Sequence, residues 1–169
     1  MKMREILVVA LLAGCVGCNP GPSTDTKAKD QTDIRALEDR FLTAFKAKDV
    51  HAIMACYVPD QSLIVFDVVP PRQYTGAQAY TKDWEDFFAA FPGSVDGSLS
   101  DLDITVGGDV AYSHSIQHAS LTDKGGKKLE LTVRVTDGYK RINGQWLISH
   151  EHVSAPVDLA TSKPDLDSK

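Results

Sequence analysis

The sequence has few cysteines and no excess of positive charge, and each absence excludes a class of protein. Two of its three cysteines, Cys15 and Cys18, lie near the N-terminus. Cys56 stands alone in the remainder, which excludes a disulfide framework there and predicts a small buried residue. No cysteine or histidine group has the spacing of a zinc site. The formal net charge is −5, so a phosphate backbone would be repelled. We therefore expect no metal, no other cofactor and no nucleic-acid partner.

Long apolar runs are absent too, apart from one at the N-terminus that is too short to span a membrane as a mature helix. Residues 1–4 are positively charged and residues 6–12 are apolar, an order typical of a secretory signal. Residues 12–15 (LAGC) resemble the bacterial lipobox, whose cysteine is lipidated and becomes the first residue; the alternative is a plain signal peptide cleaved just before it. We predict an exported protein lipidated on Cys15. Since Val16 follows instead of aspartate, the resemblance implies anchoring in the outer membrane of the cell envelope through this lipid alone.

Polar segments flank the part of the chain that can fold. The residues after the lipobox contain proline and glycine and have no apolar periodicity, and the last residues are also polar. We therefore expect a signal peptide over residues 1–14, a flexible tether over 15–31, one folded domain over 32–157 and a disordered tail over 158–169.

Within the domain, apolar spacing is helical at first and alternates later. Helical spacing covers 34–45, 50–57 and 77–91, and strand patterns cover 62–69, 99–107, 110–121, 128–141 and 146–154. Early helices followed by an antiparallel meander predict an α+β domain. A long antiparallel sheet twists and curves. We therefore expect a cone-shaped, strongly curved, mostly antiparallel sheet with three N-terminal helices over its concave face, and a pocket that the helices leave unfilled.

Short motifs in a fixed order support this architecture. They are Arg40–Asp49 (RFLTAFKAKD), Phe66-Asp67, Gly76, Arg134-Val135-Thr136, Asn143–Trp146 (NGQW) and Ser149–Pro156 (SHEHVSAP). Their order resembles the SnoaL-like, ketosteroid-isomerase-related branch of the nuclear transport factor 2-like superfamily over about residues 33–157. The last motif is similar to the association domain of calcium/calmodulin-dependent kinase II. The resemblance implies the cone fold, a small-molecule pocket and a homodimer. It does not choose between the isomerases, dehydratases, hydrolases, cyclases and non-catalytic modules of this superfamily.

Asp67 is the first candidate for catalysis. It ends an apolar strand, and a carboxyl group in an apolar pocket has a raised pKa and can act as a base. Its place resembles that of the general base of ketosteroid isomerases. The alternative is a strand-end carboxylate that accepts backbone hydrogen bonds. Phe41 stands where the resemblance places a tyrosine oxyanion donor, and phenylalanine has no donor. We therefore do not expect a steroid isomerase.

Histidines on two strands form the second group of candidates. His150 and His152 alternate with Trp146 on one face of the last strand, and His114 and His118 share a face of an earlier one. If these faces are concave, His150 or His114 would relay a proton, while His118, His152 and Trp146 would line the pocket. The alternative is a core or interface role. No carboxylate accompanies them as a further metal ligand, so we expect no metal there.

Arg134 lies within an apolar alternation. Facing inward, it would need an anionic partner or ligand, and it would then stabilise negative charge in the pocket. The alternative is a surface arginine paired with Glu130 or Asp137. We expect Trp84 and Tyr57 to form part of the pocket wall.

Two functions remain open from the sequence. The first is an envelope lipoprotein that binds a small, partly apolar molecule and transfers a proton, with Asp67 as base, His150 or His114 as relay and Arg134 as charge stabiliser. The second is a non-catalytic ligand-binding, dimerisation or protein-interaction module of the same fold.

Overall fold

The computed structural model describes residues 24–166, so Cys15 and the segment interpreted as a signal peptide lie outside the described residues. The elements are α1 (Thr24–Ala47), α2 (Val50–Met54), β1 (Ile64–Phe66), β2 (Tyr74–Thr75), α3 (Ala77–Ala90), β3 (Val95–Gly107), β4 (Val110–Thr122), β5 (Lys128–Ile142), β6 (Gln145–Ser154), β7 (Val157–Asp158) and β8 (Lys163–Pro164). None of the described helices combines the length and the apolar character needed to cross a bilayer.

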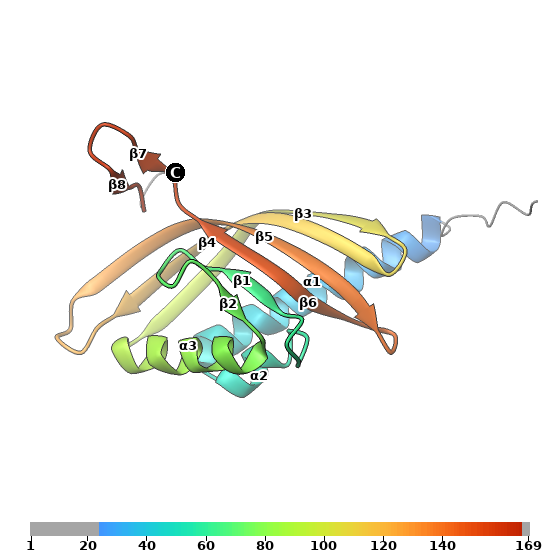
Figure 1. The fold of residues 1–169 in the computed structure, drawn as a ribbon, viewed down its shortest axis with the longest axis horizontal. Coiled ribbons are helices and arrows are strands. Elements are labelled where there is room, and N and C mark those ends of the chain that lie inside the picture. Colours follow the sequence, from blue (N-terminus) through green and yellow to red (C-terminus); the bar gives the residue numbers. More distant parts are fainter. Residues whose placement is uncertain (1–23, 167–169) are drawn as a thin grey trace, which may run out of the picture.

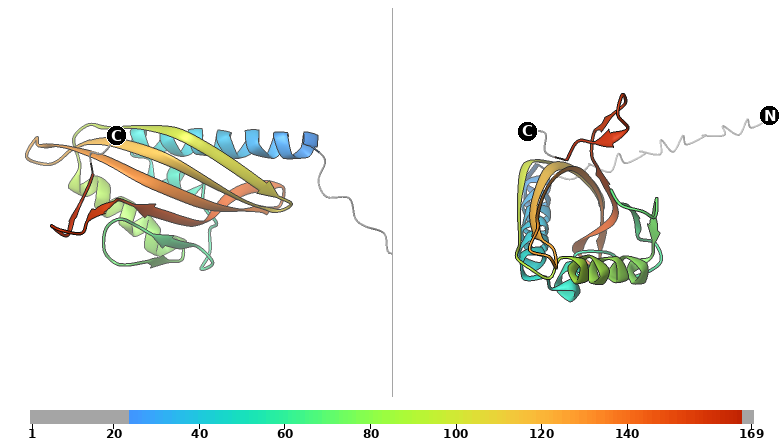
Figure 2. Two further views of the ribbon diagram at one scale, coloured as in Figure 1. Left: turned by 90° about the horizontal axis from the view of Figure 1, so that it is seen from above. Right: turned by 90° about the vertical axis from the view of Figure 1, so that its left-hand side faces the viewer.

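Six strands form one curved sheet in the order β2-β1-β6-β5-β4-β3 (Figure 1). All neighbours are antiparallel except β1 and β6, which run parallel. Register shifts interrupt the β3–β4 and β5–β6 ladders, and such bulges increase the bend of a sheet. Seen end on, the sheet is an arch, α1 lies along one wall and α3 crosses the open side (Figure 2). The predicted curved α+β architecture is confirmed.

The core lies where α1 packs against the concave face of the sheet. Ile34, Leu37, Phe41 and Phe45 recur at helical spacing and are buried. Burying side chains of this size contributes about 1.5–3 kcal/mol each to the stability of the fold. Cys56 is buried beside this core as expected, and burial raises the pKa of its thiol to about 11.

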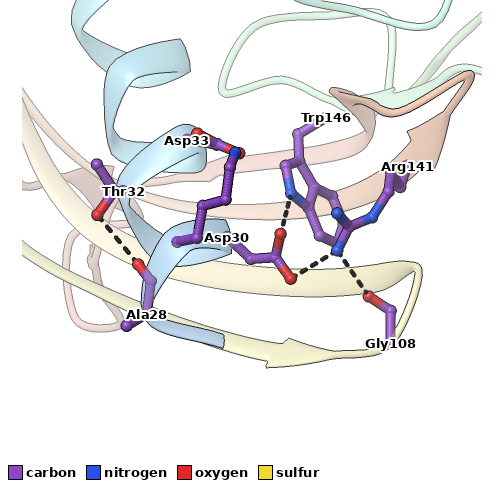
Figure 3. Close-up of polar contacts among 8 residues, drawn as sticks. Ala28, Asp30, Thr32, Asp33, Gly108, Arg141 and Trp146 are labelled. Carbon is purple, nitrogen blue, oxygen red and sulfur yellow. Dashed lines mark hydrogen bonds and ion pairs between the residues drawn. The ribbon is translucent and has the colours of Figure 1, made fainter. Parts of the chain in front are cut away.

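The first helix begins eight residues before residue 32, where the folded domain was expected to start. Residues 24–31 of the expected tether are therefore helical. Asp30, only 1% exposed, explains this. It accepts hydrogen bonds from Arg141 Nη2 at 2.6 Å and from Trp146 Nε1 at 3.3 Å (Figure 3). The Arg141 guanidinium also lies 4.5 Å from the centre of the Trp146 ring. We call these three residues the anchor cluster. Trp146 therefore holds α1 instead of lining the pocket, which corrects that expectation.

The end of the described chain is also more ordered than expected. Residues 157–164 contain the short β7–β8 hairpin, although a disordered tail was expected from residue 158. Leu166 then lies beside β5 beyond the end of β6, where its carbonyl accepts a hydrogen bond from Thr132 N at 2.7 Å. This backbone pairing satisfies an amide that β6 is too short to reach.

Candidate functional site

A cavity of about 500 Å³ lies between α1, α3 and the concave face of the sheet. Most of its wall is hydrocarbon, and the size suits a small organic molecule. The apolar lining includes Phe41, Phe45, Trp84, Phe87, Phe91, Leu121, Leu131, Val133, Val135 and Val153. At its edge the cavity is bordered by Pro164 and Leu166 of the C-terminal segment. The predicted pocket is therefore present.

Glu151 is the most deeply buried carboxyl group on the cavity wall, with 5% of its surface exposed. Tyr57 donates a hydrogen bond to Oε2 and Tyr80 donates one to Oε1, each at 2.6 Å. Burial raises the pKa of Glu151 to about 7, although the two tyrosine hydroxyls oppose the rise. Glu151 therefore changes charge close to neutral pH.

A bulge in β6 turns Glu151 toward the cavity. Gly138 pairs with His150 and Tyr139 pairs with Ile148, so Ser149 is the extra residue. Such an insertion exchanges the two faces of a strand. Trp146 and Ile148 point inward before the bulge, and Glu151 and Val153 face the cavity after it. The simple alternation used in the sequence analysis could not reveal this exchange.

The same bulge turns the histidines of β6 away from the cavity. His150 Nδ1 forms a hydrogen bond of 2.8 Å with the Ile64 carbonyl oxygen. The His150 ring contacts Phe66 edge-on, with 5.0 Å between the ring centroids. His152 is exposed and contacts the same phenylalanine at 5.7 Å. Neither borders the cavity. The expectations of a relay at His150 and of pocket lining by His152 are therefore corrected.

Of the polar residues expected in the pocket on β4 and β5, His114 and Arg134 lie on the outer face. His114 is exposed between Ser113 and Ser115, which are buried, and Arg134 is exposed between two buried valines. His118 borders the cavity, but its ring nitrogens lie 3.2 Å from Thr132 Oγ1 and 3.0 Å from Glu130 Oε2. His114 and Arg134 are therefore in no position to act on a bound molecule. On β5 the inward side of the alternation carries Val133 and Val135, whereas on β4 it carries Ser113, Ser115 and Gln117.

Asp67 borders the cavity, as expected. Burial raises the pKa of its carboxyl group, the hydrogen bond from Val68 N lowers it, and the nearby charge of Asp83 raises it. Asp83 also borders the cavity, accepts a hydrogen bond from Tyr74 Oη at 2.6 Å and has a pKa raised by burial. Asp67 thus combines both roles considered for it, since it accepts a backbone hydrogen bond and faces the pocket.

The aromatic expectations hold in part. Trp84 borders the cavity, and its Nε1 is buried without a hydrogen-bond partner. Tyr57 is 1% exposed and lies behind Glu151, so it contacts the site through that carboxyl group instead of forming the wall.

Two further buried carboxyl groups stand behind Glu151. Asp137 is its cross-strand neighbour on β5, has one oxygen without a hydrogen-bond partner and has a pKa raised well above its ordinary value by burial. Glu38 on α1 accepts a hydrogen bond from Tyr139 Oη at 2.6 Å, and burial raises its pKa as well. Within residues 24–166, no group of histidine, cysteine and acidic residues is arranged as a metal site.

The burial of these three acidic residues could be predicted from the sequence to different degrees. Glu38 lies on the apolar face of its helix beside Leu37, and Asp137 lies on the buried side of the alternation that contains Val133 and Val135. Both positions could have been identified as buried acids. For Glu151, an unbroken alternation along residues 146–154 predicted that the side chain faces away from the cavity.

Comparison with known proteins connects this geometry to a family. The model of the SnoaL-like domain matches residues 34–158. A protein of unknown function from Pseudomonas putida KT2440, described as NTF2-like, is 32% identical with a TM-score of 0.75, and the match covers 84% of this chain and 97% of that one.

Two more distant structures share the fold. A "Putative Scytalone Dehydratase" from Novosphingobium aromaticivorans is 20% identical with a TM-score of 0.72, covering 80% of this chain and 89% of that one. A "Putative calcium/calmodulin dependent protein kinase II association domain" from Xanthomonas campestris is 24% identical with a TM-score of 0.64, covering 75% and 87%. No curated protein matches the chain.

Proposed function

Because the chain belongs to the SnoaL-like domain family and has the cone fold of nuclear transport factor 2-like proteins, we propose that it binds a small, largely apolar molecule in the cavity and exchanges a proton with it. The observation that carries this proposal is Glu151, a carboxyl group with a pKa of about 7 on the wall of an apolar cavity of about 500 Å³. A group that titrates near the working pH is suited to both accepting and donating a proton.

In this proposal Glu151 takes the role first considered for Asp67. The hydroxyls of Tyr57 and Tyr80 orient its carboxyl group, and Tyr80 also borders the cavity. Asp67 supplies a second carboxyl group on the wall, so one group could remove a proton while the other returns one. Isomerisation and dehydration both require a proton to be removed at one position and delivered at another, and the neighbour described as a putative dehydratase supports chemistry of this kind.

The binding part can be tested by native mass spectrometry of the purified protein. We expect a co-purified organic molecule that is lost on denaturation. Ala119 borders the cavity, so Ala119→Phe should fill part of the space and reduce the bound fraction. The matched control is Ala89→Phe, because Ala89 is exposed on α3 and does not border the cavity. Equal occupancy in the two variants would contradict binding in the cavity.

The catalytic part is tested with the molecule so identified. Glu151→Gln keeps the size of the side chain and removes its ability to exchange a proton, so turnover should fall by at least about 10² if it is the general base. Unchanged turnover in Glu151→Gln would refute the role of Glu151. Absence of any conversion by the unmodified protein would leave the non-catalytic alternative, which Phe41 favours because it borders the cavity without offering a donor.

For location, the proposal is an exported protein anchored in the outer membrane of the cell envelope through a lipid on Cys15. The support is the order of charged, apolar and small residues that precedes this cysteine. The expected result is an N-terminal peptide that begins at a lipidated Cys15 in mass spectrometry, and a protein that fractionates with membranes. Cys15→Ser should release the protein from membranes, whereas Cys18→Ser should not. Membrane association that persists in Cys15→Ser would contradict the lipid anchor.

For assembly, the proposal is a homodimer formed through the outer face of the sheet. Tyr112 supports it, because this large side chain is 52% exposed on the outer face of β4. Light scattering should give twice the mass of one chain. Tyr112→Glu should shift the protein toward monomer, because a charge is costly to bury in an interface. A monomeric mass for the unmodified protein would refute the dimer.

A further inference from the structure

The described wall of the cavity contains acidic side chains but no lysine or arginine. Asp67, Asp83 and Glu151 border it, and His118 is the one basic side chain that does. Its ring is already engaged by Glu130, whose side chain is half exposed. An anionic molecule would therefore meet only like charges and would leave its own charge unpaired.

Negative charge also extends behind the wall. Asp137 is 1% exposed and one of its carboxylate oxygens has no hydrogen-bond partner. It stands next to Glu151 across the strand pair, and the charge of Glu151 adds to burial in raising the pKa of Asp137. Among the described residues, Lys48 is the cation held against the cavity-bordering Phe91, but its ammonium donates to the Phe91 and Gly93 carbonyl oxygens. Within residues 24–166, the acids that border the cavity therefore have no lysine or arginine partner.

Aromatic rings from α1 and α3 form another part of the wall. The Trp84 ring contacts Phe41 at 5.9 Å, Phe45 at 6.0 Å and Phe87 at 5.6 Å between centroids, all edge-on. Tyr80 adds a fifth ring at 5.7 Å from Trp84. Aromatic faces attract cations through their quadrupole, most strongly when water is excluded. A cavity wall that combines these rings with carboxyl groups lacking a positively charged partner is complementary to a cation with a hydrocarbon body.

We propose that the cavity selects a lipophilic cation, an amine that is protonated at neutral pH and attached to a flat hydrocarbon body. The inference rests on the proposed small-molecule function and specifies the class of molecule bound. The ammonium group would face Glu151, and the hydrocarbon would lie against the rings around Trp84. Such a ligand supplies the positive charge that the wall lacks.

Binding of a cation should release a proton from the site. Glu151 is faced by Asp137 from β5, Asp67 from the end of β1 and Glu38 from α1, and by the hydroxyls of two tyrosines. Burial, together with the charges of Asp67 and Glu38, raises its pKa to about 7, against the two tyrosine hydrogen bonds. An ammonium group favours the ionised carboxylate, so its affinity should increase as the pH rises through this value.

The test compares three probes with the same ring system: 2-(1-naphthyl)ethylamine, 2-(1-naphthyl)ethanol and 1-naphthylacetate. Calorimetry at about pH 8, above the Glu151 pKa, should show the amine binding about tenfold more tightly than the alcohol and the carboxylate binding most weakly. At about pH 6 the preference for the amine should shrink. An alcohol or carboxylate that binds as tightly as the amine would overturn the inference and leave the proposed function intact. No binding by any probe, together with no co-purified molecule, would overturn both.

Variants then test which carboxyl group recognises the ammonium group of the amine probe. Glu151→Gln should weaken the amine about tenfold at about pH 8 and leave the alcohol nearly unchanged. If this variant does not fold, Asp67→Asn provides the same test nearer the cavity edge, because asparagine can still accept the hydrogen bond from Val68 N. Glu85→Gln is the matched control, since Glu85 is exposed on α3 and does not border the cavity. Equal weakening of amine and alcohol by Glu151→Gln and by Asp67→Asn would contradict charge recognition.

Discussion

The anchor cluster and the cavity both bury a carboxyl group, but they neutralise it differently. Asp30 meets a guanidinium nitrogen of Arg141 at 2.6 Å, whereas Glu151 meets only two tyrosine hydroxyls. An opposite charge favours the ionised form of a buried acid, while hydroxyl groups offset its burial only in part. The first arrangement fixes a helix against the sheet. The second leaves a carboxyl group that can change charge, which is the property that proton transfer or cation binding requires.

The largest expected effect comes from breaking the anchor cluster. Arg141→Ala leaves the Asp30 carboxylate buried without its cation, and such a loss costs about 3–5 kcal/mol of unfolding free energy. Urea unfolding measures it. Lys82→Ala is the control, because it removes an ion pair with Asp86 whose two side chains are both exposed and should cost far less. Similar losses in the two variants would show that Asp30 does not depend on Arg141.

The pH dependence of stability provides the next largest effect. The pKa of Glu151 is raised to about 7 in the folded state from 4.5, so the unfolded chain ionises first as the pH rises. Its stabilising contribution is therefore complete below about 4.5 and is lost between there and about 7, by about 3 kcal/mol. Glu151→Gln should remove this decrease of the unfolding free energy with rising pH. Unfolding free energies of both proteins, measured from about pH 4 to about pH 8, give the difference. Parallel curves would mean that folding does not change the pKa of Glu151.

The sequence predicted the arrangement of helices and strands well, because each element carries its own apolar period. Phe41 and Phe45 mark one face of α1, and alternating apolar residues mark the long strands. The start of α1 could not be predicted in this way. Residues 24–31 are polar, and their helix depends on Asp30 meeting Arg141 and Trp146, which are more than a hundred residues away along the chain.

The candidate site was predicted only in part, and the errors have two physical causes. Asp67 and Trp84 border the cavity as expected. Arg134 was assigned to the cavity although its neighbours Val133 and Val135 line it, and His114 was assigned there although it lies on the exposed face of β4. The prediction for His150 was wrong for a different reason. The bulge at Ser149 exchanges the faces of β6 and places Glu151 inside. Local alternation does not reveal such an insertion, because it depends on pairing with β5.

The smallest expected effect tests the hydroxyl groups that distinguish the cavity from the anchor cluster. Tyr80 donates a hydrogen bond to Glu151 and thereby lowers its pKa, in opposition to burial. Tyr80→Phe removes that donor, so the titration midpoint of Glu151 should move upward by about one pH unit, equivalent to about 1.4 kcal/mol. Carbon-13 NMR of the glutamate carboxyl groups measures the midpoint directly. Tyr112→Phe, on the exposed outer face of β4, should leave it unchanged. A midpoint unmoved in Tyr80→Phe would mean that the hydroxyl does not stabilise the ionised form, and the absence of a cation would then be what distinguishes the cavity acid from Asp30.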